Sequence, residues 1–322
     1  MKIAGCAKAR ILTHNHAMKR LLIIGCGDVA MRAIPLLARR YRIFALVRNP
    51  ACREKLRALG VLPVLGDLDD RTGSAMRTGL ARIAGLADAV LHFAPPPSAP
   101  PLTRGGREGL GVDARTRHLL AALSLRKLPE QLVYISTSGV YGDCGGAFVS
   151  ESHPLNPQTA RAQRRADAER QIRNWAKRNR VKASILRVPG IYAADRLPLD
   201  RLRQGVPCII GSEDSYTNHI HADDLARIVA AALRYGKAGR VYHASDDSRL
   251  KMGEYFDAVA DASGLPHPPR VSRAEAQRVQ PETLLSFMNE SRRLTNRRMK
   301  RELRVRLRYP AVADMLATIE CS

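Results

Sequence analysis

Several features are scarce in this sequence, and each absence excludes a class of protein. No apolar run approaches 18 residues, so a membrane-spanning helix is excluded. The six cysteines form neither a CxxC pair nor another metal-ligand spacing, which is typical of reduced thiols in a cytoplasmic protein. Aromatic residues make up only 5% of the chain, too few to interleave with basic side chains as single-stranded nucleic-acid surfaces require. Nucleic acid is therefore not the expected partner.

Acidic residues are also few, with 30 Asp+Glu against 53 Lys+Arg and a formal net charge of +23. A basic surface attracts anions, including phosphorylated substrates, nucleic acid and acidic lipid head groups. No block of five or six like charges occurs, so the charge can equally be spread over solvated helix faces.

Apolar segments alternate with amphipathic ones, which is typical of βαβ units and a mostly parallel sheet. The expected strands are Leu21–Ile24, Ile43–Val47, Pro63–Leu65, Ala89–Phe93, Leu132–Ser136, Ala183–Val188 and Val241–Ala244. Helices are expected near 29–39, 51–59, 74–83, 112–124, 159–178, 222–235 and 253–262. The sequence thus predicts an α/β, Rossmann-type doubly wound parallel sheet with a smaller C-terminal substrate lobe.

The first expected strand leads into a glycine turn, Gly25-Cys26-Gly27-Asp28-Val29-Ala30. In such a loop the first glycine permits a sharp turn, the second lets the backbone approach a pyrophosphate, and a small third residue packs the helix on the strand. A carboxylate beside a pyrophosphate is unfavourable, and Asp28 can be tolerated there if it caps the helix with its side chain turned away.

The second expected strand ends at Arg48 and carries no acid to hold a ribose 2′-hydroxyl. A guanidinium at this place would pair with a 2′-phosphate, which favours NADP over NAD. The alternative is that Arg48 is a solvated loop charge.

From Lys19 to Pro310 the sequence resembles the extended, epimerase/dehydratase-like branch of the short-chain dehydrogenase/reductase superfamily. Five segments carry this resemblance: Gly66-Asp67-Leu68, His92-Phe93-Ala94-Pro95, Ser136 to Gly142, Leu186 to Tyr192, and His219 to Asp224. The resemblance implies that Asp67 and Leu68 contact adenine, that Ala94 and Pro95 line the cofactor, and that Pro189 lies beside the nicotinamide.

Domain limits follow from the same pattern. We expect residues 1–18 to be a disordered extension, and the alternative for residues 1–17 is an upstream mis-start. Residues 19–190 and about 219–246 would form the NAD(P)-binding domain. Residues about 191–218 and 247–322 would form the lobe.

The chain departs from the family at the helix after the Ser/Thr-bearing strand. Active relatives carry Tyr and Lys four residues apart there, and counting back from Glu169 these places hold Arg161 and Arg165. Arginine stays protonated, so neither can exchange a proton with a substrate, although Arg165 could donate hydrogen bonds to a ribose. The Asp-Glu pair of the dehydratases does not follow Thr137 either. The chain therefore resembles an atypical member without the Tyr-xxx-Lys pair.

Thr137 and Tyr141 are the remaining candidates for the reacting end. Thr137 would orient a substrate carbonyl, or simply bond to backbone at the strand end. Tyr141 would act as an acid if a neighbouring arginine lowered its pKa, or would only line the cleft.

Two other groups of residues have a functional and a structural interpretation. His219 and His221 could share a metal, but no third ligand is placed, so no metal is expected, and Asp223 or Asp224 as a helix N-cap explains the segment. A group of arginines in the C-terminal region could meet an acidic or phosphorylated substrate or form a solvated helix: Arg292, Arg293, Arg297 and Arg298.

The sequence predicts a cytoplasmic monomer or homodimer that binds NADP and acts as an epimerase/dehydratase-like oxidoreductase. Its substrate would be small, polar, and anionic or nucleotide-sugar-like. The alternative is a non-catalytic NADP(H)-binding redox sensor, and nucleic-acid binding through the arginine-rich helices is the third hypothesis.

Overall fold

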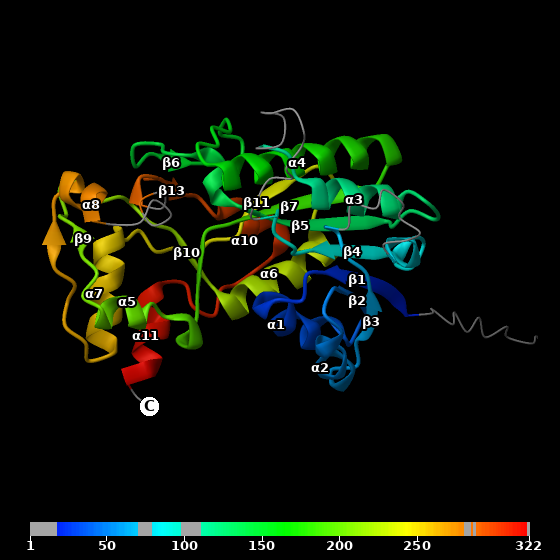
Figure 1. Cartoon of the computed structure of the whole chain (residues 1–322), viewed down its shortest axis with the longest axis horizontal. Helices are drawn as coiled ribbons and strands as arrows, with labels where there is room; N and C mark the ends of the chain where they lie inside the picture. The colour runs from blue at the N-terminus through cyan, green and yellow to red at the C-terminus, as the bar shows by residue number, and fades with distance from the viewer. Residues whose placement is uncertain (1–17, 70–78, 98–110, 280–284, 286–287, 321–322) are drawn as a thin grey trace, which may run out of the picture.

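The computed structural model describes residues 18–69, 79–97, 111–279, 285 and 288–320 (Figure 1). The expected extension over residues 1–17 and the first half of the expected helix 74–83 lie outside these ranges. The described end of that helix is a single 3-10 turn, η2 (Leu80–Ile83).

Seven parallel strands form the central sheet, and they are the seven that the sequence predicted, with ends shifted by at most two residues. They are β1 (Lys19–Ile24), β2 (Tyr41–Val47), β3 (Leu62–Leu65), β4 (Ala89–His92), β5 (Gln131–Thr137), β7 (Lys182–Val188) and β11 (Val241–His243). Their order is β11-β7-β5-β4-β1-β2-β3. The order reverses between β1 and β4, and ligands of such sheets bind outside the carboxyl ends of the strands at this point.

The side chains of β1 point alternately to the two faces of the sheet, and each face has its own core. Leu21 and Ile23 face a core that α1 (Asp28–Leu37) and α6 (Ala222–Tyr235) cover. Leu22 and Ile24 face the opposite core, covered by α3 (Ala114–Leu123) and α4 (Ala160–Asn179). Figure 1 shows α3 and α4 on one side of the sheet and α1 and α6 on the other. Both faces of each central strand are therefore buried, as parallel sheets require. The short α2 (Arg53–Ala58) follows the turn η1 (Pro50–Cys52) and contacts β3.

The lobe is built from short strand pairs and helices with a core of their own. Its pairs are β8 (Gly190–Tyr192) with β10 (His219–His221), and β9 (Cys208–Ile209) with β12 (Arg270–Val271). Its helices are α5 (Leu199–Arg203), α7 (Met252–Ala262), α8 (Arg273–Val279) and α11 (Val312–Glu320). A third pair, β6 (Phe148–Val149) with β13 (Arg293–Leu294), joins the segment after β5 to the C-terminal region.

The C-terminal region does not stay in the lobe, as the expected limits 247–322 required. Helix α10 (Arg297–Leu303) contacts α6 and β11, and its Met299 and Leu303 are buried in the core beside the sheet. The chain returns there because this face of β11 would otherwise be exposed. No helix among the described residues is long and apolar enough to cross a membrane.

Candidate functional site

The glycine turn after β1 has the geometry expected of a phosphate loop. Gly25 has φ +90°, and a Cβ added there would lie 2.7 Å from the backbone nitrogen of Ala94. Around Gly27, by contrast, an added Cβ would meet nothing within 4 Å. Ala30 is buried and packs α1 against the sheet, with Val29 half-buried beside it. The loop therefore leaves one backbone face open at the amino end of α1, where unpaired N–H groups favour an anion.

Asp28 does not cap helix α1, so capping is not what makes this carboxylate tolerable in the loop. Gly27 is the N-cap, with extended backbone, and Asp28 is the first helical residue. Its carboxylate accepts hydrogen bonds from Arg32 Nε at 3.0 and 3.1 Å and from Arg196 Nη1 at 3.0 Å. Two guanidinium groups thus compensate the acid that the loop carries.

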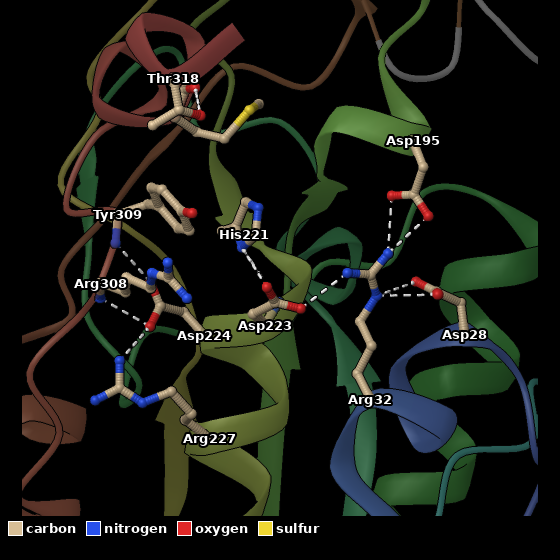
Figure 2. Close-up of polar contacts among 11 residues, drawn as sticks. Asp28, Arg32, Asp195, His221, Asp223, Asp224, Arg227, Arg308, Tyr309 and Thr318 are labelled. Atoms are coloured by element: carbon tan, nitrogen blue, oxygen red, sulfur yellow. Dashed lines mark hydrogen bonds and ion pairs between the residues drawn. The ribbon is translucent and has the colours of Figure 1, made fainter. Parts of the chain in front are cut away.

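Arg32 connects three carboxylates from separate parts of the chain. Besides Asp28, it donates to Asp223 at the start of α6 and to Asp195 in the turn η5 (Ala194–Arg196), both at 2.8 Å (Figure 2). The turn η5 belongs to the lobe segment. Arg32 therefore links the glycine turn to the lobe.

A cavity of about 250 Å³ lies outside the carboxyl ends of β1, β2 and β3. Its lining includes predicted cofactor residues, namely Gly25, Cys26, Arg48, Asp67, Leu68 and Ala94. Burial raises the pKa of the Cys26 thiol to about 12, so this group is neutral. Asp67 accepts a hydrogen bond from the Asp69 backbone at 3.0 Å, which fixes the turn after β3. The structure thus gathers these residues around one concave site.

Two further residues of this cavity were not predicted. Arg115 of α3 donates to both carboxylate oxygens of Asp69, at 2.6 and 2.5 Å, and to the Pro95 carbonyl at 2.8 Å. This pairing lowers the pKa of Asp69. No local motif marks the pair, because its members are 46 positions apart and meet only in the folded chain.

Arg48 lies at the rim of the same cavity. Its side chain is 68% exposed, and Nη1 is 3.4 Å from Asp69 Oδ2. An exposed pair of this kind is weak, so the guanidinium can move toward another anion.

A second cavity, of about 410 Å³, lies between the carboxyl ends of β5 and β7 and the lobe; we call it the cleft. Thr137 and Pro189 line it from the sheet, Arg161 lines it from α4, and the lobe segments contribute several side chains. They include Arg201, His219, Tyr255, Glu290 and Arg292.

Thr137 ends β5 at the cleft. Its Oγ1 accepts a hydrogen bond from the Gly139 backbone at 3.2 Å and caps the turn η4 (Ser138–Tyr141). Both expected roles are compatible with this position, since the hydroxyl proton is not used by the bond to Gly139.

Tyr141 does not line the cleft, and its pKa is raised, whereas a role as an acid would need a lowered pKa. Its side chain is 1% exposed and is not among the residues that line the cleft. Arg187 donates to its hydroxyl at 2.6 Å, and His243 Nε2 lies 2.5 Å away. The other ring nitrogen of His243 is 2.9 Å from the Thr295 carbonyl, so it carries the hydrogen and Nε2 accepts the tyrosine proton. Burial raises the pKa of Tyr141 to about 12.

Arg161 and Arg165 lie one turn apart on α4 but point to different surroundings. Arg165 donates to the Ile135 carbonyl at 2.8 Å and to the Tyr134 hydroxyl at 3.1 Å, and it is not among the described residues lining either cavity. Its expected contact with a ribose therefore has no support in this arrangement. Arg161 lines the cleft, and burial lowers the pKa of its guanidinium.

The two histidines of β10 have structural roles. His219 stacks on Tyr255, with ring centroids 4.1 Å apart, and burial lowers its pKa to about 3. His221 is the N-cap of α6, because its Nδ1 accepts from the Asp223 backbone at 3.2 Å. The expected cap by Asp223 or Asp224 is therefore wrong. No group of three His, Cys, Asp or Glu in the described part of the chain could hold a metal ion.

The most informative lobe residues at the cleft are Glu290 and Arg292, which form an ion pair at 2.8 Å with both side chains less than 10% exposed. Arg292 was one of four C-terminal arginines with an open interpretation, and it is the one of them that lines the cleft. Glu290 was missed, because a single acid in a polar segment carries no signal. Its Oε2 is 3.7 Å from the position of a Cβ on Gly139, and Thr137 Oγ1 is 3.6 Å from the same point.

Comparisons with known proteins agree with this architecture. The model of the NAD dependent epimerase/dehydratase family matches residues 33–245. GDP-6-deoxy-D-mannose reductase of Pseudomonas aeruginosa is 27% identical over 218 residues, which cover 60% of this chain and 71% of the reductase.

Solved structures are similar over nearly the whole chain. A functionally unknown conserved protein from Silicibacter pomeroyi DSS has a TM-score of 0.74 and 28% identity, covering 94% of this chain and 98% of that one. UDP-glucuronic acid 4-epimerase from Bacillus cereus, in complex with UDP-glucuronic acid and NAD, has a TM-score of 0.70 and 18% identity, with 94% and 98% covered. The second likeness shows the fold alone. With its family model matching about two thirds of the residues, this chain belongs to the NAD-dependent epimerase/dehydratase family.

Proposed function

We propose that this protein is a nicotinamide-dinucleotide-dependent oxidoreductase that acts on a nucleotide-linked sugar or a similarly polar substrate with a non-standard set of reacting groups. The observation that carries the proposal is the pair of cavities outside the carboxyl ends of the sheet strands. Gly25 and Cys26 of the glycine turn line the first, and Thr137 and Glu290 line the second. When bound, the dinucleotide would supply the hydride acceptor or donor.

The loop from Gly25 to Ala30 would hold the pyrophosphate, and the cavity with Asp67 and Leu68 would receive the adenosine end. The residues fit this group, because the Gly25 turn leaves room only for glycine and Gly27 leaves the approach open. The same resemblance implies that the dinucleotide, on its way from this cavity to the cleft, would contact Ala94, Pro95 and Pro189.

The choice of dinucleotide rests on Arg48. The solved epimerase relative holds NAD. In this chain β2 ends in an exposed guanidinium, and we propose that it binds the 2′-phosphate of NADP.

In the cleft, we propose that residues other than those of the resembled branch orient the substrate and transfer the proton. Arg161 and Arg165 cannot exchange protons, and Tyr141 is buried in its own network. We propose that the Thr137 hydroxyl orients the substrate oxygen and that the Glu290 carboxylate holds the proton that this oxygen gains or loses.

The test is a calorimetric titration of the purified protein with NADPH, NADP, NADH and NAD, repeated with Arg48→Ala. Micromolar or tighter binding of NADPH is expected. The variant should lose about 10- to 150-fold in NADPH affinity, because hydrogen bonds to charged groups contribute about 1.5–3 kcal/mol. NADH affinity should be unchanged. Equal binding of NADH and NADPH in both proteins would remove the NADP assignment, and no binding of any dinucleotide would remove the proposed function.

A second candidate function is a non-catalytic dinucleotide sensor, favoured by the two arginines at the places of the Tyr-xxx-Lys pair. The two functions differ in their response to Glu290→Gln. Loss of turnover with retained NADPH binding would support the enzyme. Binding of oxidised and reduced dinucleotide without turnover of any sugar nucleotide would support the sensor, and small-angle scattering should then show a lobe position that depends on redox state.

A further inference from the structure

A third cavity, of about 500 Å³, lies at the other end of the sheet from the cleft; we call it the α4 groove. Its walls are the last turns of α4, the first residues of β7 and residues 238–239, which lead into β11. The cleft lies at the carboxyl end of the seven-residue strand β7, about 20 Å away. The α4 groove shares no lining residue with the cleft or with the cavity beside the glycine turn, so it is a separate site.

The floor of the α4 groove is apolar. Val181, Ala183 and Ile185 line it from the start of β7, because alternate residues of a strand face the same side of the sheet. Ala176 lines it from α4. All four side chains belong to the core that α3 and α4 cover. A ligand in the groove would therefore lie against apolar side chains at the edge of this core.

The rim of the α4 groove is basic. Arg173, Lys177 and Arg180 are four and three residues apart, so they share the face of α4 that borders the groove. Lys182 lines the groove from β7. No acidic residue is among the described residues that line it. The groove thus combines an apolar floor with a cationic rim.

Three of the four cations are available to a ligand. Arg173 is held by the chain itself, since its guanidinium lies 3.7 Å from the Glu169 carboxylate and donates to the Gly239 carbonyl at 3.3 Å. The side chains of the other three cations have no ion-pair or hydrogen-bond partner within the described part of the chain. Like charges on one rim repel one another, and an anion placed among them relieves this repulsion.

Arg180 occupies a backbone position that favours glycine. It is the C-cap of α4, with φ +55° and ψ +31°, and its backbone N–H donates to the Ala176 carbonyl. This left-handed conformation is unfavourable for a residue with a Cβ, and helices that end in this way usually carry glycine there. Unfavourable backbone conformations of this kind are concentrated at ligand sites. The chain thus places a guanidinium at the groove where glycine would suit the backbone better.

We propose that the α4 groove binds a small amphipathic anion, an apolar body of medium-chain length that carries a carboxylate or phosphate head group. The body would lie on the apolar floor, and the head group would accept charge-assisted hydrogen bonds from Lys177, Arg180 and Lys182. No aromatic side chain is among the described lining residues, so a nucleobase would find no stacking partner there. A concave site of this volume suits a small ligand better than a lipid surface.

The test is calorimetry of the full chain with four ligands that separate charge from apolar body. Octanoate and octyl phosphate carry both features, acetate lacks the apolar body, and octan-1-ol lacks the charge. At least one of the two amphipathic anions should bind about tenfold or more tightly than acetate and octan-1-ol. The ratio between the two anions identifies the preferred head group. Their affinity should be the same with and without saturating NADPH, because the sites are separate.

Arg180→Gly separates the loss of a ligand contact from damage to the fold. Glycine relieves the left-handed cap, so the melting temperature should be unchanged or higher, whereas affinity for the preferred anion should fall about three- to tenfold. Combined with Lys177→Gln, the loss should reach about tenfold or more. Arg178→Gln is the matched control, because Arg178 is exposed on the same helix and does not line the groove. It should keep the wild-type affinity.

The proposal is overturned if neither amphipathic anion binds more tightly than acetate and octan-1-ol, or if the double variant stays within twofold of the wild type. Competition between NADPH and the anion would also overturn it, because the anion would then occupy the cavity beside the glycine turn. Binding to phosphatidylglycerol vesicles without binding of either single-chain anion would assign the basic rim to a lipid surface instead.

Discussion

Two glycines of one loop should respond in opposite ways to the same substitution. Gly27→Ala adds a methyl group where nothing lies within 4 Å, on backbone with φ −78° and ψ −174° that any residue adopts. Alanine caps helices less well than glycine, so the free energy of unfolding should fall by less than about 1 kcal/mol. The methyl group would, however, occupy the approach of the pyrophosphate. Loss of one charge-assisted hydrogen bond there should weaken NADPH binding by about 10- to 150-fold.

Gly25→Ala should instead damage the fold. Its φ of +90° is unfavourable for alanine, and the new Cβ would lie 2.7 Å from the backbone nitrogen of Ala94, which cannot move independently of β4. Strain and overlap together should lower the free energy of unfolding by about 2–4 kcal/mol.

Urea unfolding and NADPH calorimetry on both variants separate these effects. Gly211→Ala is the matched control, since Gly211 also has nothing within 4 Å and lies in the lobe. It should change neither quantity. NADPH affinity of Gly27→Ala within twofold of the wild type would refute the reasoning that this loop holds the pyrophosphate.

Three further changes test other parts of the argument. Tyr141→Phe leaves the buried Arg187 donor and His243 acceptor without their partner. Urea unfolding should therefore show a free energy of unfolding lower by about 2–4 kcal/mol, with NADPH affinity unchanged. A loss of NADPH affinity would instead indicate that Tyr141 belongs to the site. Arg32→Ala removes the cation shared by three carboxylates near the glycine turn. Calorimetry should show NADPH binding about three- to tenfold weaker at low salt, with a smaller loss at high salt. Equal NADPH affinity of the variant and the wild type at low salt would contradict this expectation. Stability should also fall as the pH falls from about 6.5 to 4, because the unfolded chain takes up protons that three buried histidines exclude. These are His92, His219 and His243, each with a pKa lowered to about 3 by burial. In this pH window each histidine lowers the free energy of unfolding by about 1.4 kcal/mol for every unit by which the pH falls. Asp246 opposes them, since burial raises its carboxyl pKa to about 7 and its contribution is lost as the pH rises. The net slope should be about 2–3 kcal/mol per pH unit, and a flat urea-unfolding profile between pH 7 and 5 would contradict the burial of the histidines.

The sequence by itself determined the sheet. Each central strand is a continuous apolar run, because a parallel strand is buried on both faces, and helical periodicity separates the runs. The glycine loop could likewise be predicted from the sequence, since its conformation depends on local backbone freedom at Gly25 and Gly27. That Arg161 and Arg165 stand at the places of the family's tyrosine and lysine is a prediction that rests on the resemblance to the family.

Only the tertiary structure decided the contents of the two cavities. Tyr141 follows Thr137 closely in sequence, yet the turn η4 directs it into a network with Arg187 and His243, from strands that come much later in the chain. Asp69 and Arg115 likewise meet across 46 positions, and Glu290 reaches Gly139 from the C-terminal region. Backbone preference and apolar periodicity are local properties, so the sequence carries them. A polar site is assembled from side chains on separate elements, and its composition follows from the packing that brings those elements together.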